Sequence, residues 1–549
     1  MRIIAAAGEF DLPMDFETQI TKYNAMLTDA GEQSNPLTLR PSPINMELVG
    51  WSNRLDALYK PISDIDVLIA DGLSVRPANL AIHTADEEDG ISCTLYLGTG
   101  DFYSRVGNTR LKWLTWPTVK SPNYENESLE QRVDYLIGIL KEQFSNPHPG
   151  EQYKVAPVAT TEEIEWFDEG ISRKRPFILN CFEDFFWSLP AEGEVNIQTF
   201  QGEYVHSKLE GDDVITLGKG YGMTPFLKLG YVLGVVFSKF GYSFDSSEIE
   251  EMSANLLADT VVLNNVADAI YSGVLKYSQL LPDMLIKDFI KETERSLAGK
   301  FIVNEVTKVI RFRFYKNTLK RDVVVDLTPY LCSRVKLGTA EFKTIKISAS
   351  EKLTETDETD ETVERFEFKL LEESEVDILF KDNFEEADGS VSIGMVNAEG
   401  IIYLNSAFVV NGETKESDDR AATTLQLFTV RDDWRDKTIF DTEGRELIVR
   451  FKGSSYFLDI EFTGPGLLAI DRIKWLYDEF IAFYKSSNIP ATAKLMIPAA
   501  IIESIDQHLP VMLNGQKLLI EYMKKATAND NSDVVTEVRF RTLRSYEDR

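Results

Sequence analysis

The side chains that most often perform acid–base chemistry are few in this chain. Its four histidines are far apart, with no pair at helical or zinc-ligand spacing: His83, His148, His206 and His508. Histidine is the commonest general base near neutral pH because its ordinary pKa is about 6.5. Each of the four is better explained as a surface or core residue than as a metal ligand, so no catalytic histidine is predicted.

Motifs that position a nucleophile or a phosphate are also missing. The chain contains no Gly-x-Ser-x-Gly segment and no glycine-rich loop ending in Gly-Lys-Ser/Thr. Gly218, Gly220 and Gly222 do not have the spacing of a dinucleotide-binding loop, and no Val/Ile-rich strand directly precedes them. They favour a turn that leads into a buried helix. We therefore name no catalytic and no cofactor-binding residue, and expect no cofactor.

The acidic residues are numerous but do not form a recognisable site. Residues 382–389 resemble an oxygen-rich calcium loop, but Phe384 occupies a position where an EF-hand needs an oxygen ligand. Asp388-Gly389 is better explained as a hairpin turn. A glycosidase needs two carboxylates about 5–10 Å apart, and none of the 89 acidic side chains is singled out for that role. His-Glu-x-x-His is absent, so a zinc endopeptidase is disfavoured and no metal ligand is named.

Cysteine content and hydropathy indicate the compartment. Cys93, Cys181 and Cys332 are odd in number and widely spaced, which fits three buried thiols in a reducing cytoplasm. The longest apolar stretch, 223–237, is shorter than the roughly 20 residues that cross a bilayer. The N-terminal apolar stretch is too short for a signal peptide. We expect no membrane span.

Net charge limits the choice of partners. The formal charge is −31, from 89 acidic and 58 basic side chains. Such a charge repels phosphate backbones, so sequence-specific binding of nucleic acid is not expected. A channel lined with carboxylates would still let DNA pass without retaining it. The simpler interpretation is that most of the charge keeps a large subunit soluble.

Local patterns predict a β-dominated α+β fold with a few packed helices. Short strands are predicted at 65–70, 94–97 and 111–114, with an extended loop around Pro36, Pro41 and Pro43. Helices are predicted after Ser128, whose capping box includes Gln131, over 226–240, over 283–298 with Gly299 as the C-terminal cap, and over 473–484. A hairpin is predicted at 301–303 and 309–315, with Ile310, Phe312 and Phe314 on its buried face and Arg311 and Arg313 on its solvated face. Further strands are predicted near 366–370, 447–451, 458–462, 518–522 and 538–540.

These patterns divide the chain into five regions. Residues 1–117 form a β-rich N-terminal domain, and 118–176 a helix and a linker that ends in the solvated loop 172–176. Residues 177–350 form a middle α+β region, and 351–470 a β-rich insertion or domain that begins with the acidic run 351–364. Residues 471–549 complete the fold as an α+β segment. At 549 residues the chain is too long for one ordinary core.

Three stretches resemble a known family. They are 10–16 with 27–36 and 53–56, then 221–230 ending at 240–242, and then 281–290 with 299–301, where a short helix leads into a hairpin. The ending 510–520 is similar in character. Together they resemble the central baseplate hub, or tail-associated protein, of tailed phages and related contractile injection systems.

The resemblance implies a structural protein of the virion tail tip, assembled in the host cytoplasm, rather than an enzyme. It implies β-barrel-like domains, two of them alike in each subunit, in a homotrimeric ring that leaves a channel for DNA. The implied partners are the tail tube or distal tail protein, a spike or fibre protein, and the tape measure protein. Two alternatives remain open: a tail-borne peptidoglycan hydrolase, and a receptor- or glycan-binding tail protein.

Overall fold

The structure is a computed structural model of the chain. It describes residues 1–339 apart from short gaps, the longest being 55–63 and 198–205. It then describes the strands at 344–349, 366–369, 375–380, 394–396, 402–404, 427–440 and 446–456. It also describes residues 425 and 483, and 490–543 with gaps at 499–500, 503–504 and 528–534.

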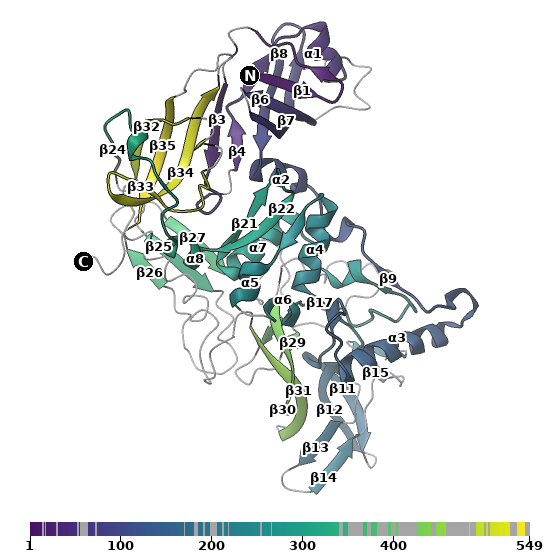
Figure 1. Cartoon of the computed structure of the whole chain (residues 1–549). Coiled ribbons are helices and arrows are strands. Elements are labelled where there is room, and N and C mark those ends of the chain that lie inside the picture. The colour runs from purple at the N-terminus through teal and green to yellow at the C-terminus, as the bar shows by residue number, and fades with distance from the viewer. Residues whose placement is uncertain are drawn as a thin grey trace.

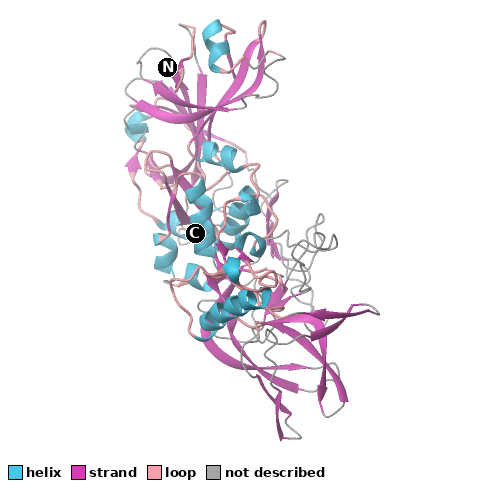
Figure 2. Cartoon of the chain, turned by 90° about the vertical axis from the view of Figure 1, so that its right-hand side faces the viewer, coloured by secondary structure: helices cyan, strands magenta, loops and turns pink. Residues whose placement is uncertain are grey.

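The molecule is long, and its layers follow one another along that length (Figures 1 and 2). Strands from both ends of the chain lie together at one end of the molecule. Helices fill the middle, and long strands from 153–217 and 427–456 occupy the other end. The predicted β-dominated α+β class is confirmed.

The N-terminal part of the large sheet forms because its strands alternate between apolar and polar residues. Its elements are β1 (Arg2–Ala5), β2 (Gly8–Glu9), β3 (Thr18–Tyr23), β4 (Glu32–Ser34), β5 (Leu37–Leu39), β6 (Asp64–Asp71), β7 (Ser74–Asp86) and β8 (Gly90–Leu97), with helix α1 (Pro43–Leu48). Ile3, Ile69, Leu80 and Leu95 lie in its core. Burying one face and solvating the other is typical of antiparallel sheets.

The C-terminal part of the sheet has a separate core. It comprises β23 (Val325–Asp326), β24 (Lys336–Leu337), β32 (Ala491–Met496), β33 (Val511–Leu513), β34 (Gln516–Thr527) and β35 (Val535–Thr542). Leu495, Ile520, Val538 and Phe540 are among its buried residues. The predicted strands near 518–522 and 538–540 are confirmed as β34 and β35.

The two parts are one sheet, because β3 pairs with β34. The order is β2-β1-β6-β7-β8-β4-β3-β34-β35-β32-β24. Within the described residues this sheet is open rather than a closed barrel, with the two-residue strands β2 and β24 at its ends.

The middle of the molecule is built on a larger apolar core, in which Phe102, Phe237, Phe289, Phe301 and Phe312 are buried. Its helices are α2 (Thr99–Val106), α3 (Leu129–Ser145), α4 (Leu229–Lys239), α5 (Ser247–Met252), α6 (Leu256–Asp259), α7 (Ile286–Leu297) and α8 (Tyr315–Lys320). Its strands include β9 (Thr118–Val119), β17 (Phe226–Lys228), β18 (Ser243–Asp245), β19 (Thr260–Val262), β20 (Leu275–Lys276), β21 (Gly299–Asn304) and β22 (Val309–Phe314).

Three of the four predicted helices are found in the described residues, two of them with shifted ends. The capping box of Ser128 and Gln131 is present at the start of α3. The first three residues of the predicted helix 226–240 form β17, and the helix starts at Leu229. Helix α7 is capped by Ala298, which takes the left-handed conformation (φ 51°), and not by Gly299. Gly299 is required for close approach instead, because a Cβ there would lie 2.5 Å from the ring of Phe312.

The predicted hairpin is confirmed as β21 and β22. Ile310, Phe312 and Phe314 are buried, as the alternation predicts. The prediction that both arginines are solvated holds for Arg311 only. Arg313 keeps 11% of its side chain exposed, because it pairs with Asp506.

The far end of the molecule consists of β10 (Tyr153–Lys154), β11 (Val158–Asp168), β12 (Ile171–Leu179), β13 (Phe185–Leu189), β14 (Gly193–Ile197), β15 (His206–Glu210) and β16 (Asp213–Leu217). β28 (Gly394–Val396) and β29 (Ile402–Leu404) join the sheet of β11 and β12, and β30 (Leu427–Phe440) and β31 (Glu446–Tyr456) lie at the same end. β25 (Thr344–Ala349), β26 (Phe366–Lys369) and β27 (Glu375–Phe380) form a separate sheet near α8 (Figure 1). β26 and β31 confirm two predicted strands.

Several local predictions are wrong. Residues 111–113 form a 3-10 helix and not a strand. The proline-marked loop contains β5 and α1, because Pro43 suits the first turn of a helix. The expected solvated loop 172–176 belongs to β12, which pairs with β11. The acidic run 351–364, the loop 382–389 and nearly all of the predicted helix 473–484 lie outside the described residues.

Candidate functional site

The join between β3 and β34 brings the two ends of the chain together. Six residue pairs are in register, from Thr18 opposite Thr527 to Tyr23 opposite Tyr522. β3 also pairs with β4, so it connects the two parts of the sheet. We call the β3–β34 pairing, with the loops at its lower end, the seam.

Asn24, directly after β3, holds the lower end of the seam. Its side chain is fully buried. The Asn24 amide group donates to the carbonyl oxygens of Gln507 and Ile520, at 2.7 Å each. Its own backbone N–H donates to the carbonyl of Glu521 at 2.9 Å. One asparagine thus satisfies backbone groups from two C-terminal segments.

His508 completes this cluster from the C-terminal side. Its Nδ1 lies 3.0 Å from Oδ1 of Asn24. Because the Asn24 amide nitrogen already donates twice, Oδ1 is the acceptor, and the neutral imidazole must carry its proton on Nδ1. Burial lowers the pKa of His508 to about 4. The negative charge of Asp506 acts to raise this pKa, and the positive charges of Arg313 and Lys22 act to lower it.

Asp506 extends the cluster to the middle of the molecule. Its carboxylate lies 3.2 Å from the Arg313 guanidinium on β22 and accepts the backbone N–H of His508 at 3.0 Å. Burial acts to raise the pKa of Asp506, but the His508 ring when it is protonated, the Arg313 guanidinium and the backbone N–H of His508 outweigh it, so the pKa lies below its ordinary value. This cluster therefore joins the N-terminal part of the sheet, its C-terminal part and the middle of the molecule, through Asn24, residues 506–508 and Arg313 respectively.

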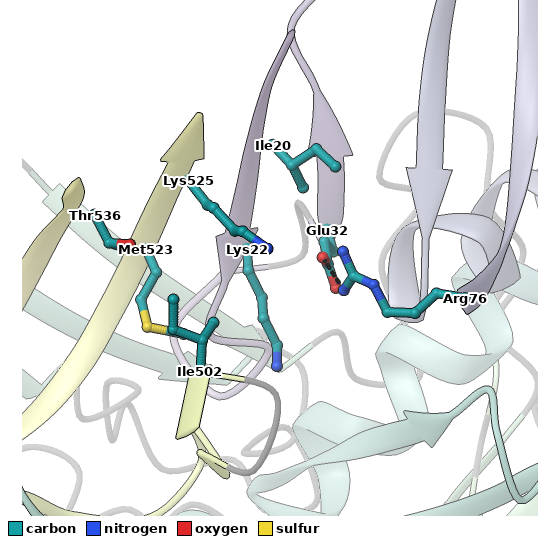
Figure 3. A pocket seen from close by; sticks show the side chains of 8 residues that line it. All are labelled: Ile20, Lys22, Glu32, Arg76, Ile502, Met523, Lys525 and Thr536. Atoms are coloured by element: carbon teal, nitrogen blue, oxygen red, sulfur yellow. Dashed lines mark hydrogen bonds and ion pairs between the residues drawn. The ribbon is translucent and has the colours of Figure 1, made fainter. Parts of the chain in front are cut away.

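A small cavity lies on the inner face of the seam, between the two apolar cores (Figure 3). The Arg76 guanidinium and the Glu32 carboxylate are 2.7 Å apart at its side. Its volume of about 20 Å³ is room for one or two water molecules and not for an organic substrate. The lining residues are Ile20, Lys22, Glu32, Arg76, Ile502, Met523, Lys525 and Thr536.

The outer face of the seam carries rings and positive charges. Thr492, Arg539, Tyr522 and Tyr23 lie opposite one another on successive strands. The rings of Tyr23 and Tyr522 are 6.0 Å apart and meet edge to face. Lys524 Nζ lies 5.0 Å from the Tyr522 ring centre. Burial raises the pKa of the Tyr522 hydroxyl above its ordinary value.

The four histidines do not come together. His83 is on β7 with its Nε2 2.9 Å from the hydroxyl of Thr94, His148 follows α3, and His206 begins β15. Of the cysteines, Cys93 is buried as predicted, but Cys332 is exposed, and Cys181 lies outside the described residues. Across the described ranges, no group of three or more His, Cys, Asp and Glu side chains could hold a metal ion.

The Asn24 cluster could not be predicted from the sequence. Its members are separated by up to 484 residues, and none belongs to a motif. Only the isolated Asp506-Gln507-His508 triplet, polar between apolar neighbours, could have drawn attention to the C-terminal part.

No helix in the described part of the chain is long and apolar enough to cross a bilayer.

The chain has a weak structural similarity to a phage protein and no match to a protein family. No protein-family model matches the chain, and no curated protein matches it. Among solved structures, prophage tail protein gp18 from Listeria monocytogenes EGD-e is similar at 7% identity and a TM-score of 0.28. The match covers 98% of this chain and 93% of that one. A TM-score this low does not establish a shared fold.

Proposed function

We propose that the chain is a structural subunit of a phage-type tail, the hub that joins the tail tube to a central spike or fibre. The observation that carries the proposal is the seam, at which two β-sheet parts with separate cores become one sheet. The resemblance to hub proteins implies two β domains in each subunit, so that a trimer can present six of them to a six-fold tube.

The placement of the resembling stretches supports the same proposal. Residues 221–242 and 281–301 lie in one core, in which Phe237 and Phe301 have ring centres 5.2 Å apart. The chain leaves α7 directly into the β21–β22 hairpin. Arg313 of that hairpin pairs with Asp506, so the middle of the molecule is connected to the seam.

We further propose a homotrimeric ring with a channel for DNA, located at the virion tail tip. The open ends of the sheet support this, because β2 and β24 leave the sheet able to continue into a neighbouring subunit. The tail tube or distal tail protein, the spike or fibre and the tape measure protein are the proposed partners.

We propose no enzymatic activity. The cavity at the seam holds only water-sized groups. Two ionisable groups of the Asn24 cluster, Asp506 and His508, are engaged with Arg313 and Asn24. A hydrolase site would instead need an accessible pair of carboxylates in a cleft.

Co-purification with the tail proteins encoded beside its gene tests the proposal. The hub proposal predicts that the full chain retains a tail-tube or spike protein and clears no cell wall in a zymogram. A chain that retains neither, and that clears peptidoglycan, would replace the hub with a hydrolase. Tight binding to one glycan on an array, without tail partners, would favour the receptor-binding alternative.

A further inference from the structure

The C-terminal part of the sheet is basic, although the chain is strongly acidic. On β23, β24, β32, β33, β34 and β35 the acidic residues are Asp326, Glu521 and Glu537, whereas the basic residues are Lys336, Lys494, Lys517, Lys524, Lys525, Arg539 and Arg541. The chain as a whole has a formal charge of −31. This local reversal of charge is not needed to keep the protein soluble.

Four of these side chains share the outer face. Lys336 lies opposite Thr492, and Thr492 opposite Arg539. Lys494 and Lys524 both lie opposite Glu537, one on each side. The alternate residues Ala493, Met523 and Val538 are buried in the core, which fixes the charged residues on the solvent side. We call Lys336, Lys494, Lys524 and Arg539 the basic face.

Within the described part of the chain, no carboxylate forms an ion pair with the three lysine ammonium groups of the basic face. Arg539 pairs with Glu521 at 2.8 Å. Lys524 lies over the Tyr522 ring, and no ion pair joins Lys336, Lys494 or Lys524 to a carboxylate among the residues described. Three lysines are therefore available to an acidic partner.

The same chain presents a matching acidic surface. The turn between β7 and β8 reads Asp86-Glu87-Glu88-Asp89, and all four residues are exposed. The Asp86 carboxylate accepts the backbone N–H groups of Glu88 and Asp89, at 2.6 and 2.9 Å, and its pKa is lowered by these bonds. Gly90 fixes the turn at φ 89°, where a Cβ would clash with the Leu39 carbonyl. We call residues 86–89 the acidic tip.

We propose that the acidic tip of one copy of this chain docks on the basic face of the next copy. Opposite charges on two different surfaces of one chain give a heterologous contact, which can close into a ring. Charge pairs of this kind act chiefly on partner choice and association rate. The inference rests on the proposed hub function, because it names the contact between hub subunits.

Charge reversal tests the contact in the full chain. The mass of the protein in solution is measured by light scattering for the wild type, Lys494→Glu/Lys524→Glu, Glu88→Lys/Asp89→Lys, and the four changes combined. The matched control is Lys239→Glu/Lys276→Glu, two exposed lysines of the middle region that undergo the same change of charge. Thermal unfolding of each variant checks that it is folded.

Each reversal alone is expected to raise the dissociation constant of the oligomer on the order of a hundredfold, because like charges then face each other. The combined variant is expected to recover most of the affinity, and the control to keep it. Dissociation in 0.5 M salt is expected as well, since exposed charges are screened within about 5 Å there.

An oligomer that survives both reversals would overturn this contact and leave the hub proposal standing. A wild-type chain that binds tail proteins but remains a single copy with and without them would overturn both this contact and the proposed trimeric ring. Retention of DNA by the wild type, lost in Lys494→Glu/Lys524→Glu, would show that the basic face serves a nucleic acid instead. A chain that neither binds tail proteins nor forms an oligomer would overturn the proposed function itself.

Discussion

His508 donates a hydrogen bond from Nδ1 to Oδ1 of Asn24 over 3.0 Å, although 484 residues separate them in the sequence. The contact lies where the N-terminal strand β3, the C-terminal loop and, through Asp506, the hairpin strand β22 meet. The integrity of the seam is therefore expected to depend on a few polar side chains.

Asn24→Ala is expected to destabilise the protein by about 3 kcal/mol, because it leaves two buried carbonyl groups without donors. The free energy of unfolding from urea denaturation measures the effect. Asn35→Ala serves as the control, since the Asn35 amide makes an exposed bond to Gln19 and its loss should cost less than about 1 kcal/mol. Equal effects of the two changes would contradict the role given to Asn24.

Acid is expected to weaken the fold through His508. The pKa is about 4 in the folded chain and about 6.5 when unfolded, so the unfolded state binds the proton more tightly. This contribution to stability is complete above pH 6.5 and is lost as the pH falls towards 4, by about 3 kcal/mol in all.

His508→Asn tests this assignment, because its amide can donate to Asn24 from nearly the same position but does not titrate. Urea unfolding between pH 7 and 4 should show a shallower loss of stability in the variant than in the wild type. Parallel curves for the two proteins would rule out His508 as the titrating group.

Removing the ion pair between Arg313 and Asp506 is expected to lower the free energy of unfolding by about 1–2 kcal/mol. Arg313→Met leaves the Asp506 carboxylate, which is partly buried, without its cation. In a double-mutant cycle, adding Asp506→Asn should recover part of the loss. Arg311→Met is the control on the same strand, because its pair with Asp245 leaves 63% of the arginine side chain exposed. An additive cycle would mean that the two groups do not interact.

Two glycines are expected to respond oppositely to alanine. Gly299→Ala places a methyl group against the Phe312 ring and the Arg313 carbonyl, and should destabilise the protein by about 2–3 kcal/mol. Gly138→Ala, in the middle of α3 with open space around it, should stabilise by up to about 1 kcal/mol. Shifts of melting temperature with the same sign would contradict this geometry.

The elements predicted correctly are those specified by local pattern. The capping box of Ser128 and Gln131 defined the start of α3, and the alternation of Ile310, Phe312 and Phe314 defined β22. The strand β12 was missed, because Arg173 and Arg175 gave it the composition of a loop, whereas pairing with β11 decides its structure. The seam was not predicted either, since pairing Tyr23 with Tyr522 depends on the whole fold between them and not on either sequence.

The most direct test of the hub proposal is the mass of the full wild-type chain by light scattering, alone and with the tail-tube and spike proteins encoded beside it. The proposal predicts a species of three times 62.3 kDa, either by itself or once a tail protein is added. A mass of 62.3 kDa that persists at high concentration and in the presence of those proteins would contradict it.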